Sequence, residues 1–216
     1  MRRNLLQSVT GIAIFSVLLG LVYPLALTGI SQVLFPGRAD GSRIEQNGRA
    51  VGSSLIGQSF ARPVLGAGGK PRTDADGNLL TRPDRRYFQS RPSVTGYSAD
   101  VTYFNNLGPN DRQLEQLFAK NARAYLALER PYDPGLTLAD VPPDAVQTSA
   151  SGVDPHISQA NAAIQAHRVA TVRGLSLGRV RELIDANTDG RFASVLGEPG
   201  VNVLELNLDL DRESAR

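Results

Sequence analysis

The sequence predicts an α+β fold: a single transmembrane helix near the N-terminus, followed by a soluble domain with a small mixed sheet and about three helices. The first observation behind this prediction is the stretch from Asn4 to Gly37, which contains no Asp, Glu, Lys or Arg. The second is that the remaining chain has the charge and hydrophobicity of an ordinary globular protein. The third is that helical and strand-like patterns follow without the regular strand–helix–strand alternation of an α/β sheet.

The apolar segment is long enough to cross a bilayer. Gly11 to Ile30 contains 20 mostly apolar residues, and about 20 residues of helix span a hydrocarbon core of about 30 Å. We therefore expect a short cytoplasmic N-terminus at residues 1–8, a transmembrane region at 9–33 and a soluble domain at 36–216. The alternative is a cleaved signal peptide, which the length of the apolar stretch and the lack of a small-x-small cleavage site disfavour.

Three residues of the span, Gly20, Tyr23 and Pro24, are predicted to pack against partner helices. Proline has no backbone N–H and is expected to kink the helix, and neighbouring helices in a membrane commonly satisfy the carbonyl that it frees. Gly11 and Gly20 are nine positions apart, so they do not form the GxxxG motif of a helix dimer.

The charges that flank the span predict its orientation. Arg2 and Arg3 precede the span, while Arg38, Arg43 and Arg49 follow it. The positive-inside rule applies to short segments, because long domains translocate largely regardless of charge. The short basic tail therefore predicts a cytoplasmic N-terminus and an extracytoplasmic, periplasmic body. The chain has no cysteine, which is compatible with either compartment.

The first half of the body is predicted to be poor in regular structure. Residues 36–100 are rich in Gly, Pro, Ser and Arg with short apolar runs, which indicates loops and short strands, with an exposed excursion at residues 66–78. After Pro109, the sequence Asn110–Gln113 resembles the start of a capped helix, and apolar residues at helical spacing continue it to about Glu129. Residues 131–143, with four prolines, are predicted to form a connector.

The second half of the body is predicted to hold two more helices and a final strand. Asp154 and Pro155 resemble the N-cap and first residue of a helix that ends at Gly174. A shorter helix is expected from about residue 176 to 186. Leu204–Leu210 alternates apolar and polar residues, which predicts a strand with one buried face and a β-bulge near residues 203–204.

Several motifs resemble functional sites only in part. Asp185–Gly190 matches the start of a calcium-binding EF-hand loop, but position twelve is Leu196 instead of Glu, so a helix C-terminus with an Asn/Gly turn is the better interpretation. Gly68-Gly69-Lys70 lacks the preceding Gly and the following Ser or Thr of a phosphate-binding loop. The 23 Lys and Arg residues are spread along the chain, which gives no support for nucleic-acid binding.

The residues offer no catalytic or metal-binding set. The chain has two histidines, His156 and His167, which would lie on nearly the same face of the predicted helix. Zinc needs more ligands than these two, and no nucleophile, base and orienting group occur in a recognisable pattern. Thr148–Pro155 is different, because hydroxyl residues and a glycine lead into a capped helix whose N-terminal amides could hold an anion. The alternative for this segment is an ordinary ST-turn and cap.

At the level of whole motifs, the chain resembles the C-subunit family of the Kdp high-affinity potassium-transporting ATPase. The resemblance covers essentially the whole length. The motifs that carry it are Val22–Leu25, Phe35-Pro36, Asp40–Ser42, Gly52–Gln58, Tyr87–Ser93, Asn106–Pro109, Thr148–Ser158, Arg168–Ala170 and Leu196–Leu208. The chain departs from the family pattern in a longer segment at residues 61–86, in Thr102–Asn105, and at Gln159 and His167.

The resemblance implies a non-catalytic subunit in the bacterial inner membrane. Its implied partners are a channel-like potassium-translocating subunit, an ATP-hydrolysing P-type subunit, a small single-span subunit and membrane lipid. It also implies a catalytic chaperone that raises the ATP affinity of the pump subunit, with ATP as a ligand only within that complex.

The resemblance implies that the segment Thr148–Gly152 touches nucleotide. The candidate nucleotide or partner contacts here are Ser149, Ser151, Gly152, Asp154 and Arg168. An extracytoplasmic body cannot reach cytoplasmic ATP, so for these residues we expect a turn or a partner contact instead of a nucleotide site. Two other classes of function remain: a membrane-anchored binding module for a small solute, and an anchored hydrolase, which the missing catalytic set disfavours.

Overall fold

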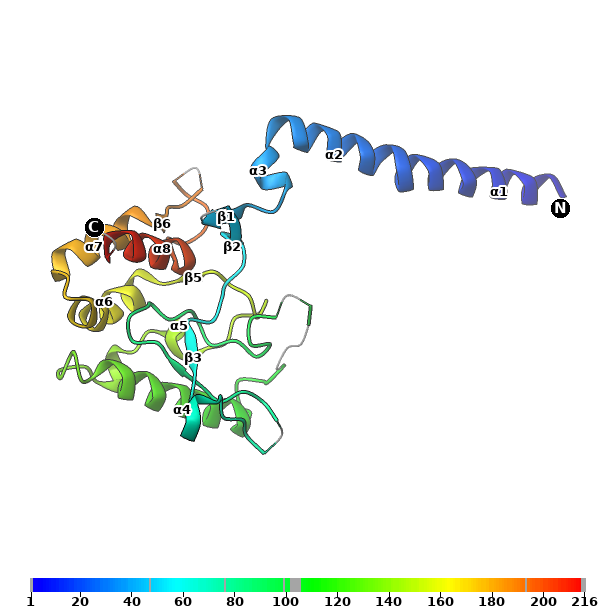
Figure 1. Cartoon of the computed structure of the whole chain (residues 1–216). Helices are drawn as coiled ribbons and strands as arrows, with labels where there is room; N and C mark the ends of the chain where they lie inside the picture. Colours follow the sequence, from blue (N-terminus) through cyan, green and yellow to red (C-terminus); the bar gives the residue numbers. More distant parts are fainter. Residues whose placement is uncertain are drawn as a thin grey trace. The chain divides into compact units, whose positions relative to one another are not determined.

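The computed structural model describes residues 2–46, 48–75, 77–98, 100–101, 106–192 and 194–214. The chain divides into two compact units, Met1–Ser53 and Ser54–Arg216, the second of which we call the body. The α+β class is confirmed, since small sheets and several helices follow one N-terminal apolar helix (Figure 1). The predicted departure at Thr102–Asn105 lies outside the described residues.

The first unit contains the apolar helix and a short hairpin. The elements are α1 (Arg2–Val17), the π-helical turn η1 (Leu18–Val22), α2 (Tyr23–Leu34), α3 (Pro36–Ala39), β1 (Arg43–Gln46) and β2 (Arg49–Ser53). The strands β1 and β2 pair antiparallel. The first three elements form one continuous helix of 33 residues, Arg2–Leu34, in which no residue of the most apolar window is buried. This helix therefore begins before the predicted span and includes the short N-terminal tail.

The sequence predicts a distortion at Pro24, and the structure has a π turn directly before it. The N–H of Tyr23 donates to the carbonyl of Leu18, five residues earlier. Proline cannot donate to the preceding turn and its ring crowds that turn, and a π turn is one of the known ways in which a helix accommodates this. Gly20 lies within the π turn, so all three predicted packing residues of the span lie at this irregularity.

The elements of the body are β3 (Ala61–Pro63), the 3₁₀ turn η2 (Ala67–Gly69), β4 (Thr81–Pro83), α4 (Arg112–Glu129), the 3₁₀ turn η3 (Leu138–Asp140), α5 (Pro143–Val146), β5 (His156–Ile157), α6 (Gln159–Arg173), α7 (Leu177–Ala186), β6 (Thr188–Asp189), β7 (Gly200–Asn202) and α8 (Val203–Ser214). Two predicted helices, α4 and α7, are confirmed, but the cap of α4 is Asp111 and not Asn110, the first residue of the predicted capping sequence. The Asp111 side chain accepts a hydrogen bond from the N–H of Gln113 at the start of α4, and Ser176 accepts one from Arg179 at the start of α7. The predicted connector holds only η3 and the first residue of α5.

The predicted start of α6 is wrong. Asp154 and Pro155 precede the short strand β5, and the N-cap is Ser158, whose hydroxyl accepts from the N–H of Asn161 at 3.1 Å. The helix ends as predicted, with Gly174 in the left-handed conformation at φ +69°. Both Asp154 and Ser158 are good N-cap residues. Because His156 and Ile157 pair with β7 as a strand, the helix can begin only after them, and Ser158 is the cap.

The predicted C-terminal strand is also wrong, because residues 203–214 form α8. The side chain of Asn202 accepts from the N–H of Glu205 at 3.2 Å and so caps the helix. Val203, Leu206 and Leu210 are at most 1% exposed, a spacing of three and four residues that marks one helix face. The alternating leucines fit this helix because leucine is a strong helix former. The core also buries residues at both odd and even positions of the segment, such as Val203 and Leu206. The predicted bulge is absent from this segment, where β7 passes directly into the helix.

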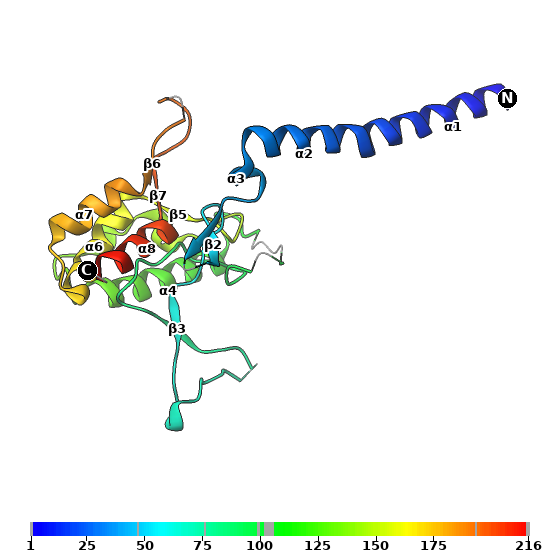
Figure 2. The same ribbon diagram turned by 45° about the horizontal axis from the view of Figure 1, so that its top comes forward.

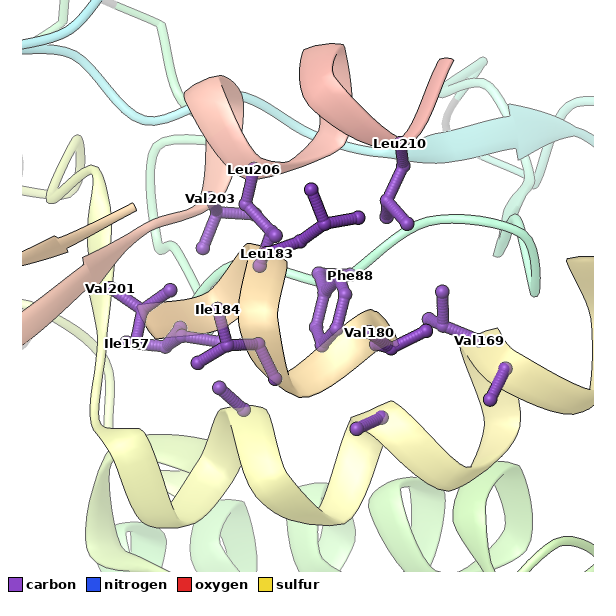
Figure 3. Close-up of a cluster of buried hydrophobic side chains, with 13 residues drawn as sticks. Phe88, Ile157, Val169, Val180, Leu183, Ile184, Val201, Val203, Leu206 and Leu210 are labelled. Atoms are coloured by element: carbon purple, nitrogen blue, oxygen red, sulfur yellow. The ribbon is translucent and has the colours of Figure 1, made fainter. Parts of the chain in front are cut away.

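The core of the body lies where α6, α7 and α8 meet a small antiparallel sheet of order β5–β7–β6. Figure 3 shows its side chains converging from these elements. The cluster consists of Phe88, Ile157, Ala162, Ala166, Val169, Ala170, Val180, Leu183, Ile184, Val201, Val203, Leu206 and Leu210. Ten of these 13 residues lie in α6, α7 and α8, so helix packing is the main source of this core.

An extended segment around Phe88 is held by side-chain amides instead of by a sheet. The amide of Asn207 accepts from the N–H of Phe88 at 2.9 Å and donates to its carbonyl at 3.0 Å. The amide of Gln165 does the same for Gln89, at 2.7 and 3.0 Å. Buried backbone groups need partners, and here one residue from α8 and one from α6 supply them. Phe88 can therefore enter the core from a segment without regular structure.

The longer segment that follows Phe60 forms an extended hairpin, which we call the β-arm (Ala61–Pro83). Its stem is the antiparallel pair β3–β4, and further backbone hydrogen bonds join Val64, Arg72 and Leu80. Figure 2 shows the β-arm projecting from the helices of the body. The prediction of loops and short strands in this region is confirmed.

Candidate functional site

The loop Thr148–Ile157 leads from α5 to α6 and contains four of the five predicted site residues. Gly152 has φ +73°, and a Cβ there would lie 2.8 Å from Oγ1 of Thr95, so the position requires glycine. The hydroxyl of Ser93 donates to the carbonyl of Gly152 at 2.6 Å. Ser149 is buried, and its carbonyl accepts from the N–H of Gly152 at 3.3 Å.

Further hydrogen bonds hold this loop, one within it and one to Gly57. The exposed Ser151 accepts, through its hydroxyl, a hydrogen bond from the N–H of Val153 at 3.2 Å. The carbonyl of Val153 accepts from the N–H of Gly57 at 2.7 Å, and a Cβ on Gly57 would lie 2.3 Å from the carbonyl oxygen of Asp154. The segment thus has the ST-turn geometry that the sequence offers as the alternative to an anion site.

Asp154 joins this loop to the segment that carries Arg91. Its Oδ2 accepts from Nη1 of Arg91 at 2.8 Å, and its Oδ1 accepts from the N–H of His156 at 3.0 Å. The hydroxyl of Tyr97 donates to the carbonyl of Arg91. Burial raises the pKa of Tyr97 to about 12, so this group is a neutral donor at physiological pH. Asp154 therefore acts as a cross-link and not as the helix cap that we predicted.

The N-terminus of α6 does hold an anion, and the anion belongs to the chain itself. The carboxylate of Asp144, on α5, accepts from the N–H of Ser158 at 2.8 Å and from its hydroxyl at 2.7 Å. It also accepts from Nδ2 of Asn161 at 2.9 Å. A carboxylate at a helix N-terminus is stabilised by the helix dipole and by the free N–H groups. Asp144 therefore takes the place that a phosphate would need.

A histidine crosses the small sheet beside this loop. His156 on β5 reaches Asp189 on β6, with 2.8 Å between Nε2 and Oδ2, although β7 lies between the two strands. Gly200 on β7 makes the crossing possible, because a Cβ there would lie 3.1 Å from Cβ of His156. His156 is therefore a strand residue, and the predicted common helix face with His167 is wrong.

A cavity of about 340 Å³ opens between these groups. It is lined by Arg91, Asp144, Asp154, His156, Ile157, Ser158, Asp189, Glu198, Pro199 and Gly200. Four carboxylates face one guanidinium and one imidazole, a balance that repels the phosphates of a nucleotide. Within the described residues, no group of three or more His, Asp or Glu side chains is arranged to hold a metal ion.

Arg168, the fifth predicted site residue, lies in the interior of the body and is fully buried. Its Nε donates to both carboxylate oxygens of Glu129, at 2.9 and 3.0 Å. Its Nη1 donates to the carbonyls of Arg85 and Tyr87 at 2.7 and 2.9 Å, and its Nη2 donates to Gln165 at 2.8 Å. Burial raises the pKa of Glu129, and the guanidinium opposes this shift. Arg168 thus joins α4, α6 and the segment before Phe88.

Sequence reasoning missed the partners that position these residues. Asn161, Gln165 and Arg168 form a buried polar stripe on α6 at spacings of four and three residues. That spacing was visible in the sequence, because positions three and four apart share one face of a helix. Asp144 and Arg91 gave no such signal, because they lie on a four-residue helix and in an extended segment.

Replacing Asp144 by alanine is expected to lower the free energy of unfolding by about 1–3 kcal/mol, because buried donors lose their acceptor. The measurement is thermal unfolding of the full-length chain in detergent, with and without inorganic phosphate. Phosphate is expected to raise the melting temperature of the variant and to leave the parent unchanged. The control is Glu182→Ala, which removes an exposed ion pair worth about 0.5 kcal/mol. Equal melting temperatures for both variants would contradict the role of Asp144.

Comparison with known proteins identifies relatives over nearly the whole chain. The family model described as KdpC, K⁺-transporting ATPase, c chain, matches residues 5–212. The potassium-transporting ATPase KdpC subunit of Koribacter versatilis is 41% identical over 213 residues, which cover 98% of this chain and 95% of that protein. The protein of the same name from Mycobacterium tuberculosis strain H37Rv is 41% identical over 98% of this chain and 100% of its own length. That from Caldanaerobacter subterraneus is 40% identical over 93% of this chain and 90% of its own length.

Proposed function

Because the chain belongs to the KdpC family, the c chain of the K⁺-transporting ATPase, we propose that it assembles and stabilises this complex and raises the ATP affinity of the ATP-hydrolysing subunit. The chain is an accessory subunit of the complex and not the catalytic one, and one apolar helix anchors it to the membrane. The proposed partners are the channel-like potassium-translocating subunit, the P-type ATP-hydrolysing subunit, the small single-span subunit and the lipid of the bacterial inner membrane.

The observation that carries the assembly role is the helix Arg2–Leu34. At about 1.5 Å per residue it is about 50 Å long, longer than the hydrocarbon core, and none of its described residues is buried. Gly20 lies in the π turn, and Tyr23 and Pro24 follow it directly, so these three residues lie where the backbone of the helix is irregular. Irregular backbone in a membrane is best satisfied against protein. We infer that this part of the helix packs on the translocating subunit.

The body is proposed to be extracytoplasmic and to act on ATP affinity only through the assembly. The bonding of the loop Thr148–Ile157 supports this, because the hydroxyl of Ser151, the carbonyl of Gly152 and the carboxylate of Asp154 already have partners in the chain. Asp144 occupies the helix N-terminus that a phosphate would use. At the cavity, Arg91 and His156 already contact Asp154 and Asp189. We therefore favour the assembly role over a receptor for a small solute.

The test of the assembly role replaces residues 9–33 by an unrelated apolar helix of equal length, which keeps the membrane anchor. Co-purification with the other subunits is expected to fall at least tenfold, while the chain stays in the membrane fraction. The matched control replaces only residues 2–8. A complex that survives the exchange of the span would overturn the docking proposal.

The test of location uses the absence of native cysteine. A single cysteine is placed at the exposed Gln116 on α4, and a second variant carries it at Ser8. A membrane-impermeant thiol reagent is expected to label Gln116→Cys in cells with a permeabilised outer membrane, and to label Ser8→Cys only after lysis. The effect on ATP affinity is measured separately: ATP hydrolysis by the complex that lacks this chain is expected to show a higher KM for ATP than the complete complex. Labelling in the reverse order would restore direct contact with cytoplasmic ATP.

A further inference from the structure

The β-arm carries basic side chains that form no ion pair among the described residues. In the register of β3 and β4, Arg62 lies directly opposite Arg82, and like charges in such cross-strand pairs destabilise a hairpin. Lys70 and Arg72 lie beyond this stem, towards the end of the β-arm. All four side chains belong to exposed residues, and among the described residues none of them forms an ion pair.

The nearby carboxylates are already engaged. Asp84, at the base of the β-arm, is nearly buried and pairs with Arg86, at 2.8 Å between Oδ2 and Nη2. Asp74 accepts hydrogen bonds from the backbone and side chain of Asn78, at 2.8 and 3.2 Å, within a turn of the β-arm. In the sequence the β-arm has four basic and two acidic residues, Asp74 and Asp76. It therefore presents a net positive charge to whatever it meets.

Exposed leucines accompany these charges. Leu65 is 61% exposed and Leu79 is 50% exposed, and both lie just beyond the stem, opposite Pro71 and Thr73 respectively. Leucine side chains next to arginine are typical of surfaces that enter the interfacial layer of a bilayer. The β-arm is badly suited to accept another strand, because Pro63 and Pro83 lie in its two strands and proline lacks the N–H that pairing needs.

We propose that the β-arm binds the anionic phospholipid headgroups of the membrane in which the chain is anchored. The guanidinium groups of Arg62, Arg72 and Arg82 contact lipid phosphates, and Leu65 and Leu79 enter the interfacial layer. Headgroups relieve the repulsion between Arg62 and Arg82, which the nearby carboxylate of Asp84 offsets only in part because it is paired with Arg86.

A lipid surface is favoured over a protein surface as the occupant. The β-arm begins 27 residues after the helix that ends at Leu34, so the chain itself keeps it within about 90 Å of the bilayer. This tether gives the β-arm a high effective concentration at the membrane without any other subunit. The proposal requires the anchor but does not depend on the assembly role.

The test uses the full-length chain alone in nanodiscs. An environment-sensitive fluorophore is attached to a cysteine at the exposed Ala67, at the end of the β-arm. In discs with phosphatidylglycerol the emission is expected to shift to the blue and to be quenched by nitroxide-labelled lipid. Discs of phosphatidylcholine alone, or addition of about 0.5 M salt, are expected to abolish both signals.

The variant R62Q/R72Q/R82Q is expected to lower the membrane-bound fraction of the β-arm at least tenfold, since each basic residue near an anionic surface adds to the attraction. The matched control R112Q/R123Q/R181Q removes three exposed charges from α4 and α7 and is expected to change it less than twofold. Equal signals in both lipids, equal losses in both variants, or a blue shift produced by inorganic phosphate without anionic lipid would overturn the proposal. So would a signal that arises only when the other subunits are added, because the occupant would then be a protein.

Discussion

Replacing Arg168 by methionine is expected to lower the free energy of unfolding of the body by about 3–5 kcal/mol. The change leaves Glu129, which is 1% exposed, as a buried carboxylate without its partner. It also removes the donors for the carbonyls of Arg85 and Tyr87. Thermal unfolding of the full-length chain in detergent, followed by near-ultraviolet circular dichroism, measures the effect.

Two further variants distinguish the ion pair from the rest of this network. Arg123→Met, at an exposed position of α4, is expected to cost less than about 0.5 kcal/mol. The double variant Arg168→Met with Glu129→Leu removes both charges, which often restores stability to a buried pair. Here we expect only partial recovery, because two backbone carbonyls remain without donors. Full recovery would show that the carbonyl contacts add nothing, and a loss below about 1 kcal/mol for the single variant would contradict the role of Arg168.

Replacing Gly57 by alanine is expected to cost about 2–3 kcal/mol. The new Cβ would lie 2.3 Å from the carbonyl oxygen of Asp154, so one backbone segment must move. That movement breaks the hydrogen bond from the N–H of Gly57 to Val153 and displaces the carboxylate that pairs with Arg91. The loss is measured as a fall in melting temperature, and protease cleavage within residues 148–157 reports the local displacement.

Gly178→Ala is the matched control, because Gly178 lies in the first turn of α7 with no atom within 4 Å of a new Cβ. Alanine in a helix is favoured over glycine by about 1 kcal/mol, so this variant is expected to be neutral or more stable. If Gly57→Ala proved as stable as Gly178→Ala, the close approach of residues 57 and 154 would not hold in solution.

Local signals predicted the elements whose caps and periodicity agree. The helices α4 and α7 are capped by Asp111 and Ser176 and bury one apolar stripe each, so the predicted and observed helices agree within one or two residues. The failures occur where two local patterns compete. Leu204–Leu210 alternates like a strand, yet Asn202 caps a helix through the N–H of Glu205. The choice between strand and helix depends on tertiary packing, because the core buries residues at both odd and even positions of this segment.

The sequence predicted the loop of the candidate site, but not the side chains from distant segments that contact it. Ser149, Ser151, Gly152 and Asp154 lie in one turn, as the run of small and hydroxyl residues indicated. Asp144 comes from a four-residue helix, and its carboxylate bonds a residue 14 positions away. Arg91 reaches Asp154 across 63 positions. Such pairs depend on tertiary distances, which neither spacing nor propensity encodes.

The amide contacts of Phe88 determine when the body can fold during synthesis. Asn207 lies 119 positions after Phe88, so the groove that receives this phenylalanine exists only when almost the whole chain has left the ribosome. The apolar helix that ends at Leu34 emerges long before that. The membrane anchor is therefore committed while the body is still unfolded, and the body closes as one late event with many distant contacts. Truncations that remove α8 are consequently expected to leave an inserted anchor with an unfolded, protease-sensitive body.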